Sequence, residues 1–269
     1  MVLIRKIRSL FRIIGRNIKW KRDADYFRGK IKRQDISSIP EGKKIILMPH
    51  SDDEWIGCSQ ILLHNPEDSL VVNMNMDGGD NQELHQIRRK EAEAVSKKFG
   101  YRFITVQDKL SELKEIISSE NPKCVFIPCY LDWHEEHIEV MRLFQEAAIQ
   151  CNYSGLVGMY QVSLPIPAGM INCGMSMTKR QLKEKWTILK QMYRTQSFLP
   201  LKRFMLNEYI NGSITNEYAV EAYSVCNFGE WTCYFPNLLL DKEEREKYKE
   251  NLQDIMIIRT MLEERDING

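Results

Sequence analysis

Beyond residue 40, short apolar runs alternate with segments of helical periodicity, and this alternation constrains the fold more than any other feature. Strands are expected at 44–50, 69–76, 102–107 and 123–130, and helices at 53–64, 82–99, 108–119 and 135–150. Such alternation predicts βαβ units and a mostly parallel sheet. Because the expected strands are apolar along most of their length, helices should cover both faces. We therefore expect an α/β, Rossmann-like fold.

The second part of the chain is less regular and is expected to add C-terminal elaborations to this fold. Strands are expected at 156–164 and 217–225, and helices at 178–194 and, as one long charged helix, 241–265. A turn is expected at 77–80 (DGGD), and Gly100 should cap the helix before it. We expect two parts, a basic N-terminal arm (1–40) and a single domain (41–269).

The seven cysteines are scattered and include no CxxC pair. This pattern is typical of reduced structural thiols in a reducing compartment, which favours a cytoplasmic location and disfavours a cysteine-based zinc site.

The N-terminal arm carries much of the chain's positive charge. Residues 1–34 hold 12 Lys and Arg against two Asp, so the remainder of this chain of net charge +1 is acidic. Within the arm, apolar residues recur at helical spacing with basic residues between them. The apolar set is Leu3, Ile4, Ile7, Leu10, Phe11, Ile14 and Ile18.

Three interpretations of this basic amphipathic helix stay open. It packs on the acidic body, it attaches peripherally to an anionic (inner) membrane surface, or it is a cleaved presequence. The arm has no apolar stretch of the about 18 residues needed to cross a bilayer, and no signal-peptide pattern. Nucleic acid is not an expected partner, because the basic residues are confined to one arm and no reading module is visible.

Two polar clusters follow the first and fourth expected strands, "PHSDDE" (49–54) and "DWHEEH" (132–137). In open α/β sheets, ligands bind beyond the carboxyl ends of the strands. Three of the five histidines lie in these two clusters. Taken singly, each cluster has a structural interpretation, with Ser51 and Glu54 forming a helix capping box and 134–137 forming a solvated first helical turn.

Taken together, the clusters favour a metal site. His134 and His137 are three residues apart and share a helix face, as His50 and Asp53 do across a strand-to-helix turn. Two imidazoles and one carboxylate form a catalytic zinc site with a fourth position for water. A dication would also offset the repulsion among the consecutive acidic residues 52–54.

The segment "PHSDDEWIGCSQILL" resembles the first motif, (A/P)HPDDE, of the PIG-L/LmbE-like deacetylases. Asp132, His134 and His137 resemble the family's second motif, D-x-HPDH. Between them, Gly78-Gly79 and then Arg88 and Glu91 follow the family's order. Later segments, "KWTILKQMYRTQSF" with Gln196 and "EYAVEAY" with Glu221, are also similar, so the resemblance extends over about residues 43–225.

The resemblance implies a role for individual residues. It implies that His50, Asp53 and His137 ligate Zn²⁺, a set that also accepts Fe²⁺ or Co²⁺. Asp52 would be the general base for the attacking water, and His134 the general acid or the group that stabilises the oxyanion. The other implied residues are Arg88 as a sugar contact, and Glu136 and Asp132 as supports of the site.

The sequence departs from the family pattern at two places: Ser51 replaces a proline, and Glu135-Glu136 replace Pro-Asp. Glu136 stands where the family has an aspartate that orients the catalytic histidine. Trp133, between the motif residues, is expected either to line the pocket or to pack.

The resulting hypothesis is a zinc-dependent hydrolase that removes an N-acetyl group from an amino sugar of the GlcNAc type, small or lipid-linked, releasing acetate. One alternative is a non-haem iron(II) oxygenase. In such enzymes the first His usually stands two positions before the carboxylate, whereas His50 stands three positions before Asp53. Asp52 would also have no role. A second alternative is a membrane-surface binding protein acting through residues 1–34.

Overall fold

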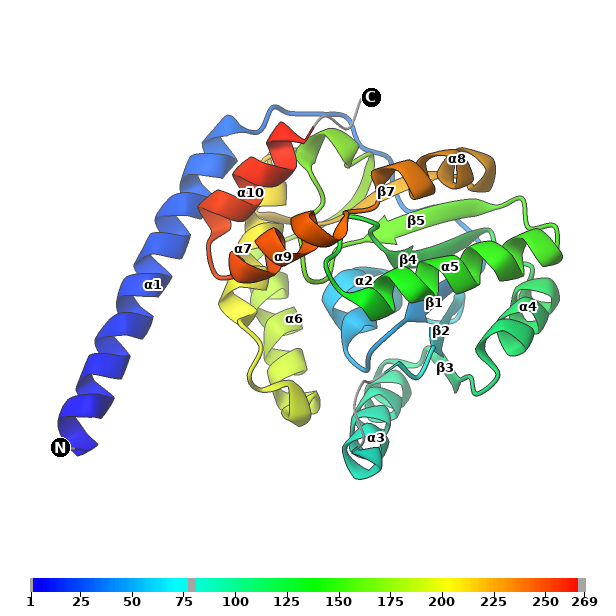
Figure 1. Ribbon diagram of the computed structural model, residues 1–269, viewed down its shortest axis with the longest axis horizontal. Coiled ribbons are helices and arrows are strands. Elements are labelled where there is room, and N and C mark those ends of the chain that lie inside the picture. Colours follow the sequence, from blue (N-terminus) through cyan, green and yellow to red (C-terminus); the bar gives the residue numbers. More distant parts are fainter. Residues whose placement is uncertain (1, 77–80, 266–269) are drawn as a thin grey trace.

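The chain folds around one seven-stranded sheet in the computed structural model, which describes residues 2–76 and 81–265 (Figure 1). The first five strands in spatial order are parallel, and the last two run antiparallel to their neighbours. The order is β3 (Arg102–Thr105), β2 (Ser69–Asn73), β1 (Lys44–Met48), β4 (Cys124–Pro128), β5 (Leu156–Tyr160), β7 (Ala219–Asn227) and β6 (Cys173–Met177). The predicted mostly parallel α/β fold is confirmed.

Helices cover both faces of the sheet because successive residues of each buried strand point to opposite sides. In β1, Ile45 and Leu47 pack toward α4 (Lys109–Glu120), α5 (Glu135–Gln150) and α8 (Phe228–Leu238). Ile46 and Met48 pack toward α2 (Asp53–His64), α3 (Gln82–Phe99) and α6 (Lys179–Met192). The remaining helices are α1 (Val2–Lys30), α7 (Leu201–Asn211), α9 (Lys242–Glu250) and α10 (Ile255–Glu264).

The sheet has a switch point between β1 and β4, which are neighbours at its centre. From β1 the chain proceeds through α2 to β2 on one side, and from β4 through α5 to β5 on the other. Connections that diverge in this way leave a crevice beyond the carboxyl ends of the two strands. The two polar clusters found in the sequence follow these two strands and therefore meet at this crevice.

The C-terminal part differs from the sequence prediction. The single helix expected at 241–265 is wrong: α9 ends at Glu250, and α10 starts anew where the Asp254 carboxylate accepts hydrogen bonds from the amides of Met256 and Ile257. Strand β6 and helices α7 and α8 were not predicted. Gly100 does cap α3, with a φ of 82°, whereas the turn expected at 77–80 lies outside the described residues.

Helix α1 packs on the domain through its C-terminal half. Trp20, Ala24 and Phe27 are buried with residues of α7 and α10 in a small separate core, while the N-terminal part extends beyond the body of the molecule (Figure 1). None of the helices in the described part of the chain combines the length and apolarity that crossing a bilayer requires. The division into an arm (1–40) and a domain (41–269) stays a prediction.

Candidate metal and catalytic site

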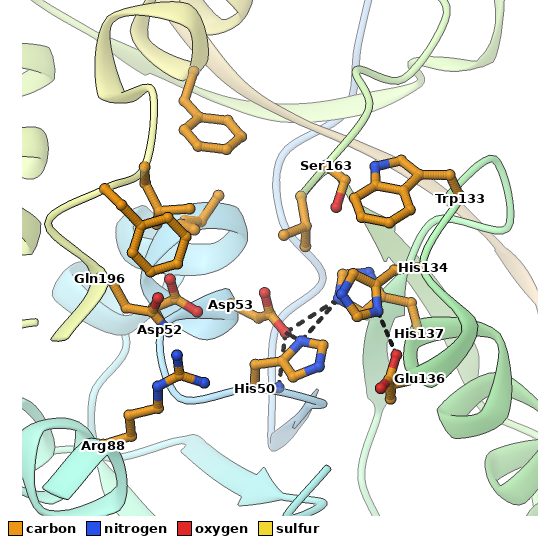
Figure 2. Close-up of a pocket in the computed structure, with 15 residues that line it drawn as sticks. His50, Asp52, Asp53, Arg88, Trp133, His134, Glu136, His137, Ser163 and Gln196 are labelled. Carbon is orange, nitrogen blue, oxygen red and sulfur yellow. Dashed lines mark hydrogen bonds and ion pairs between the residues drawn. The ribbon is translucent and has the colours of Figure 1, made fainter. Parts of the chain in front are cut away.

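A cavity of about 390 Å³ opens at the switch point, and residues of both polar clusters line it (Figure 2). The lining brings together the predicted residues His50, Asp52, Asp53, Arg88, His134, Glu136 and His137. Of the predicted set, only Asp132 lies behind the wall. The other two histidines, His64 and His85, are outside the lining.

Three side-chain atoms converge on one point in this cavity. His137 Nε2 lies 3.2 Å from His50 Nδ1 and 3.5 Å from Asp53 Oδ2, and the distance between the last two atoms is 3.3 Å. Ligands that bind a tetrahedral zinc ion at about 2.0–2.2 Å are themselves about 3.3–3.5 Å apart. The three residues therefore fit a metal ion with almost no rearrangement.

His134 belongs to the same cluster. One ring nitrogen from each of His50, His134 and His137 falls within 4.8 Å of the others, and the ring of His134 stacks on that of His137 with centroids 4.9 Å apart. The three-histidine grouping and the set with Asp53 thus overlap. We favour the set with Asp53, because its donor atoms have the shorter separations.

Backbone geometry and an outer carboxylate hold the converging atoms in place. The turn after β1 brings the backbone amide of His50 to donate to Asp53 Oδ2 at 2.9 Å. On the other side, Asp132 accepts from His137 Nδ1 at 2.9 Å and from the backbone amide of His134 at 3.0 Å. A histidine fixed by a carboxylate in this way presents its other nitrogen, here Nε2, to a metal.

The electrostatics of the cluster favour a cation. Burial alone would lower the pKa of His137, but the carboxylates of Asp132 and Asp53 outweigh it and raise the pKa to about 10. Burial would likewise raise the pKa of Asp53, yet His137 and His50 hold it far below its ordinary value. Two buried carboxylates thus require positive charge between them, which a proton or a metal ion can provide.

His134 sits in a different environment. Its Nδ1 lies 2.5 Å from Glu136 Oε2, so the longer glutamate reaches the histidine that the family's aspartate would orient. Burial lowers the pKa of His134, and the neighbouring His137 and His50 lower it further. A neutral imidazole held by a carboxylate can exchange a proton near neutral pH.

The capping-box interpretation of 51–54 is wrong. Helix α2 begins at Asp53, and no side-chain capping bond forms at its N-cap residue, Asp52. Glu54 is instead fully buried and accepts a hydrogen bond from the Tyr193 hydroxyl. Burial raises the pKa of Glu54 to about 7. Asp52 is 5% exposed and lines the cavity, where Figure 2 shows it beside Arg88 and Gln196.

Helix α3 and the segment after α6 build the next part of the wall. Glu91 accepts from the Thr195 hydroxyl at 2.5 Å and from its backbone amide at 3.2 Å. This connection holds the short helix Arg194–Gln196 against α3, so that Gln196 and Arg88 both line the cavity. Trp133, for which two interpretations were open, also lines it.

The apolar part of the wall had no signal in the sequence. It consists of Ile56, Val162, Phe198, Leu199 and Phe204. Most of these residues come from irregular segments or from the unpredicted helix α7, so no spacing connects them. Only their apolar character, in a region otherwise without periodicity, distinguishes them.

A crevice at the switch point of a parallel sheet, lined by histidines and carboxylates that converge on one point, defines the class: an α/β protein with a candidate hydrolytic metal site. Residues 45–148 match the model of the PIG-L family, described as GlcNAc-PI de-N-acetylase. The resemblance predicted from the sequence is thus confirmed over this segment, which is similar to that family. No curated protein sequence matches the chain with significance.

Several solved structures have a similar fold, and three of them are described by their identity, coverage and TM-score. The N,N'-diacetylchitobiose deacetylase from Pyrococcus horikoshii is 19% identical, with 71% of this chain and 85% of that chain covered and a TM-score of 0.56. The conserved protein TT1542 from Thermus thermophilus is 17% identical (68% and 94% covered, TM-score 0.54). The A40926 pseudoaglycone deacetylase Dbv21 is 13% identical (70% and 98% covered, TM-score 0.52).

Proposed function

We propose that this protein is a metal-dependent hydrolase that removes an N-acetyl group from an amino sugar of the GlcNAc type, free or in a glycoconjugate. The products are acetate and the free amine. The observation that carries the proposal is the convergence of His50 Nδ1, Asp53 Oδ2 and His137 Nε2 within 3.5 Å of one another. The family match of residues 45–148 and the deacetylases among the structures of similar fold support the choice of reaction.

The chemistry of an acetamide explains why such a site is needed. Its carbonyl is a poor electrophile and its nitrogen a poor leaving group, so hydrolysis requires polarisation of the carbonyl, an activated water and a proton for the amine. A Zn²⁺ ion held by His50, Asp53 and His137 would polarise the carbonyl and make the water more acidic; Fe²⁺ or Co²⁺ would suit the same ligands.

Asp52 and His134 would move the protons. Asp52, at the start of α2, would accept a proton from the water as the oxygen attacks the carbonyl carbon. His134 has its Nδ1 directed to Glu136, so Nε2 would first take up a proton, forming the imidazolium, and would then give it to the departing amine. The C–N bond then breaks with the amine leaving neutral, and the acetyl carbon keeps the oxygen of the water.

The remaining wall would bind the sugar. Arg88 and Gln196 are polar groups on the same side of the cavity as Asp52 (Figure 2), where they would hydrogen-bond to sugar hydroxyls. Trp133 lies on the opposite side with Ser163, and its indole face would pack against the ring. The iron(II) oxygenase alternative gives Asp52 and His134 no such roles.

The test combines metal content with acetate release. Protein purified without chelators should hold about one metal ion per chain by plasma mass spectrometry, and the zinc-loaded form should release acetate from N-acetylglucosaminides. His137→Ala should lose both properties. His64→Ala is the matched control and should keep both properties. His64 is exposed at the end of α2, outside the cavity, and its Nδ1 contacts the Gln60 carbonyl of the same helix.

Two results would overturn the proposal. One is stoichiometric metal in the wild type without acetate release from any N-acetylated amino sugar supplied. The other is acetate release that persists at the wild-type rate in His137→Ala after treatment with a chelator.

A further inference from the structure

Helix α1 carries two apolar stripes that have different surroundings. In its C-terminal half, Trp20, Ala24 and Phe27 are at most 7% exposed and pack on α7 and α10. In its N-terminal half, Phe11 is 69% exposed and Ile18 65%, with Ile14 at 44%. Large apolar side chains exposed in a row on one element mark an interaction surface more often than isolated ones do.

The two stripes point in different directions. At 100° per residue, Phe11, Ile14 and Ile18 lie within about 60° of one another around the helix axis. Trp20, Ala24 and Phe27 are centred about 150° away from them. The exposed stripe therefore cannot join the face that packs on the domain. The interpretation that the apolar stripe of the arm packs on the body is wrong for Phe11, Ile14 and Ile18. The side chains of Leu3, Ile4, Ile7 and Leu10 lie outside the described part of the structure.

Contacts at the edge of the domain mark where α1 leaves it. Lys19 Nζ contacts Asp254 at 2.7 Å and Asp23 at 3.0 Å, and the Trp20 indole donates to the Gln253 carbonyl at 2.6 Å. The helix before residue 19 extends away from the molecule in Figure 1. The exposed stripe is thus presented on a projecting helix that is anchored at its base.

Positive charge occupies the side of the helix away from the stripe. The first 22 residues contain eight Lys and Arg and no acidic residue, and Arg12 and Arg16 are exposed. On the helical wheel Arg12 lies about 130° and Arg16 about 170° from the centre of the stripe, and the Arg16 guanidinium lies 4.8 Å from the centroid of the Trp20 ring. An apolar face opposed by a cationic one is typical of helices that lie in a membrane interface.

We propose that the projecting half of α1 binds the surface of an anionic lipid bilayer, with Phe11, Ile14 and Ile18 inserted at headgroup depth and Arg12 reaching the lipid phosphates. Charge complementarity favours this partner over a second copy of the chain. Two copies meeting through this stripe would bring two cationic, acid-free helices together, whereas an anionic surface is attracted to each of them. The inference is independent of the proposed catalytic function.

The test is sedimentation of the full-length protein with vesicles of phosphatidylcholine alone or mixed with phosphatidylglycerol. Wild type should bind the mixed vesicles, bind less at high salt, and fail to bind phosphatidylcholine alone. The combined substitutions Phe11→Gln, Ile14→Gln and Ile18→Gln should weaken binding by about tenfold or more. Arg12→Gln should weaken it about fivefold.

The matched control is Ile149→Gln, which removes an equally exposed isoleucine (59%) from α5 and should leave binding unchanged. Because the altered side chains are exposed, the circular dichroism spectrum and Tm should stay at wild-type values. Absence of binding by the wild type, or equal binding by the triple variant, overturns the proposal. So does a concentration-dependent dimer that the triple variant abolishes without any vesicle binding, since the stripe would then join two copies.

Discussion

Two buried clusters of ionisable groups flank helix α2, and they differ in where their polar atoms point. At the N-terminus of α2, His50 Nδ1, Asp53 Oδ2 and His137 Nε2 converge on one point at the wall of a cavity. The second cluster lies beside a later part of α2 and is centred on Lys185 of α6. Lys185 is fully buried and donates to Glu221 at 2.6 Å, to Glu208, and to the Ile56 carbonyl of α2 at 2.7 Å.

The Lys185 cluster (Lys185, Glu208 and Glu221) is closed by partners from every side. Glu221 also accepts from the Ser59 hydroxyl at 2.7 Å and from the Gln60 amide at 2.8 Å. Glu208 also accepts from the Trp186 indole at 2.7 Å. These bonds connect α2 to α6, α7 and β7, so the cluster fixes the helix that carries the site. Burial and charge therefore do not by themselves mark a catalytic site; potential metal ligands that converge on one point at a cavity wall do.

The largest effect is expected from breaking the closed cluster. Lys185→Met removes the only cation of the cluster and leaves two buried carboxylates without it, which should lower the free energy of unfolding by about 3–5 kcal/mol. Urea unfolding at neutral pH measures the change. The matched comparison is His134→Gln, in the cluster of His50, Asp53, His134 and His137 at the cavity (the open cluster). It should change the free energy of unfolding by less than about 1 kcal/mol. Equal losses in the two variants would contradict the distinction between the clusters.

The second prediction concerns pH. The Lys185 cluster has one cation and two carboxylates, and the prediction concerns Glu208. Burial raises the pKa of Glu208 to about 7 from 4.5, although Lys185 opposes the rise. The folded state thus binds this proton more tightly, and the stabilisation present below pH 4.5 is lost as pH rises through about 7, by about 3 kcal/mol in total.

Comparing wild type with Glu208→Gln isolates this effect from other titrating groups. Glu208 is protonated and neutral in the folded wild type at low pH, so the neutral Gln variant should have a similar stability there, but it has no proton to release. Relative to the variant, wild type should therefore lose unfolding free energy as pH rises from 4.5 to 7, which urea unfolding at several pH values measures. A constant difference would show that Glu208 is ionised throughout.

The same contrast explains what the sequence could predict. Helices α2, α3 and α5 have the predicted bounds, because apolar periodicity and local end signals define them. The open cluster was predicted because its members follow two neighbouring strands at spacings of three residues. The closed cluster could not be, since Lys185, Glu208 and Glu221 lie on three elements with no common spacing, and only tertiary packing joins them.

Tertiary partners also overrode two local rules. Ser51 and Glu54 have capping-box spacing, yet Glu54 is turned into the core toward Tyr193. The charged pattern of 241–265 predicts one helix, but the Asp254 side chain caps a new one. Strand β6 (CGMSM) was missed because its small and polar residues lie at the edge of the sheet, where half-exposed positions carry no apolar run.

The smallest predicted effect tests the boundary of the open cluster. Asp132 lies behind the cavity and touches the converging atoms only through His137, so Asp132→Asn keeps an oxygen that can accept from His137 Nδ1 but removes its charge. The loss should weaken zinc affinity about 10- to 100-fold, as for other carboxylates that orient a metal-binding histidine. Competition with a chromophoric chelator measures the change in zinc affinity.

Ser59→Ala, which removes one donor from the closed cluster, is the control. It should leave zinc affinity unchanged while lowering the free energy of unfolding by about 1 kcal/mol. If Ser59→Ala weakened zinc binding as much as Asp132→Asn, the two clusters would be one cooperative unit, and the orientation of His137 would depend on the position of α2 as a whole and not on Asp132.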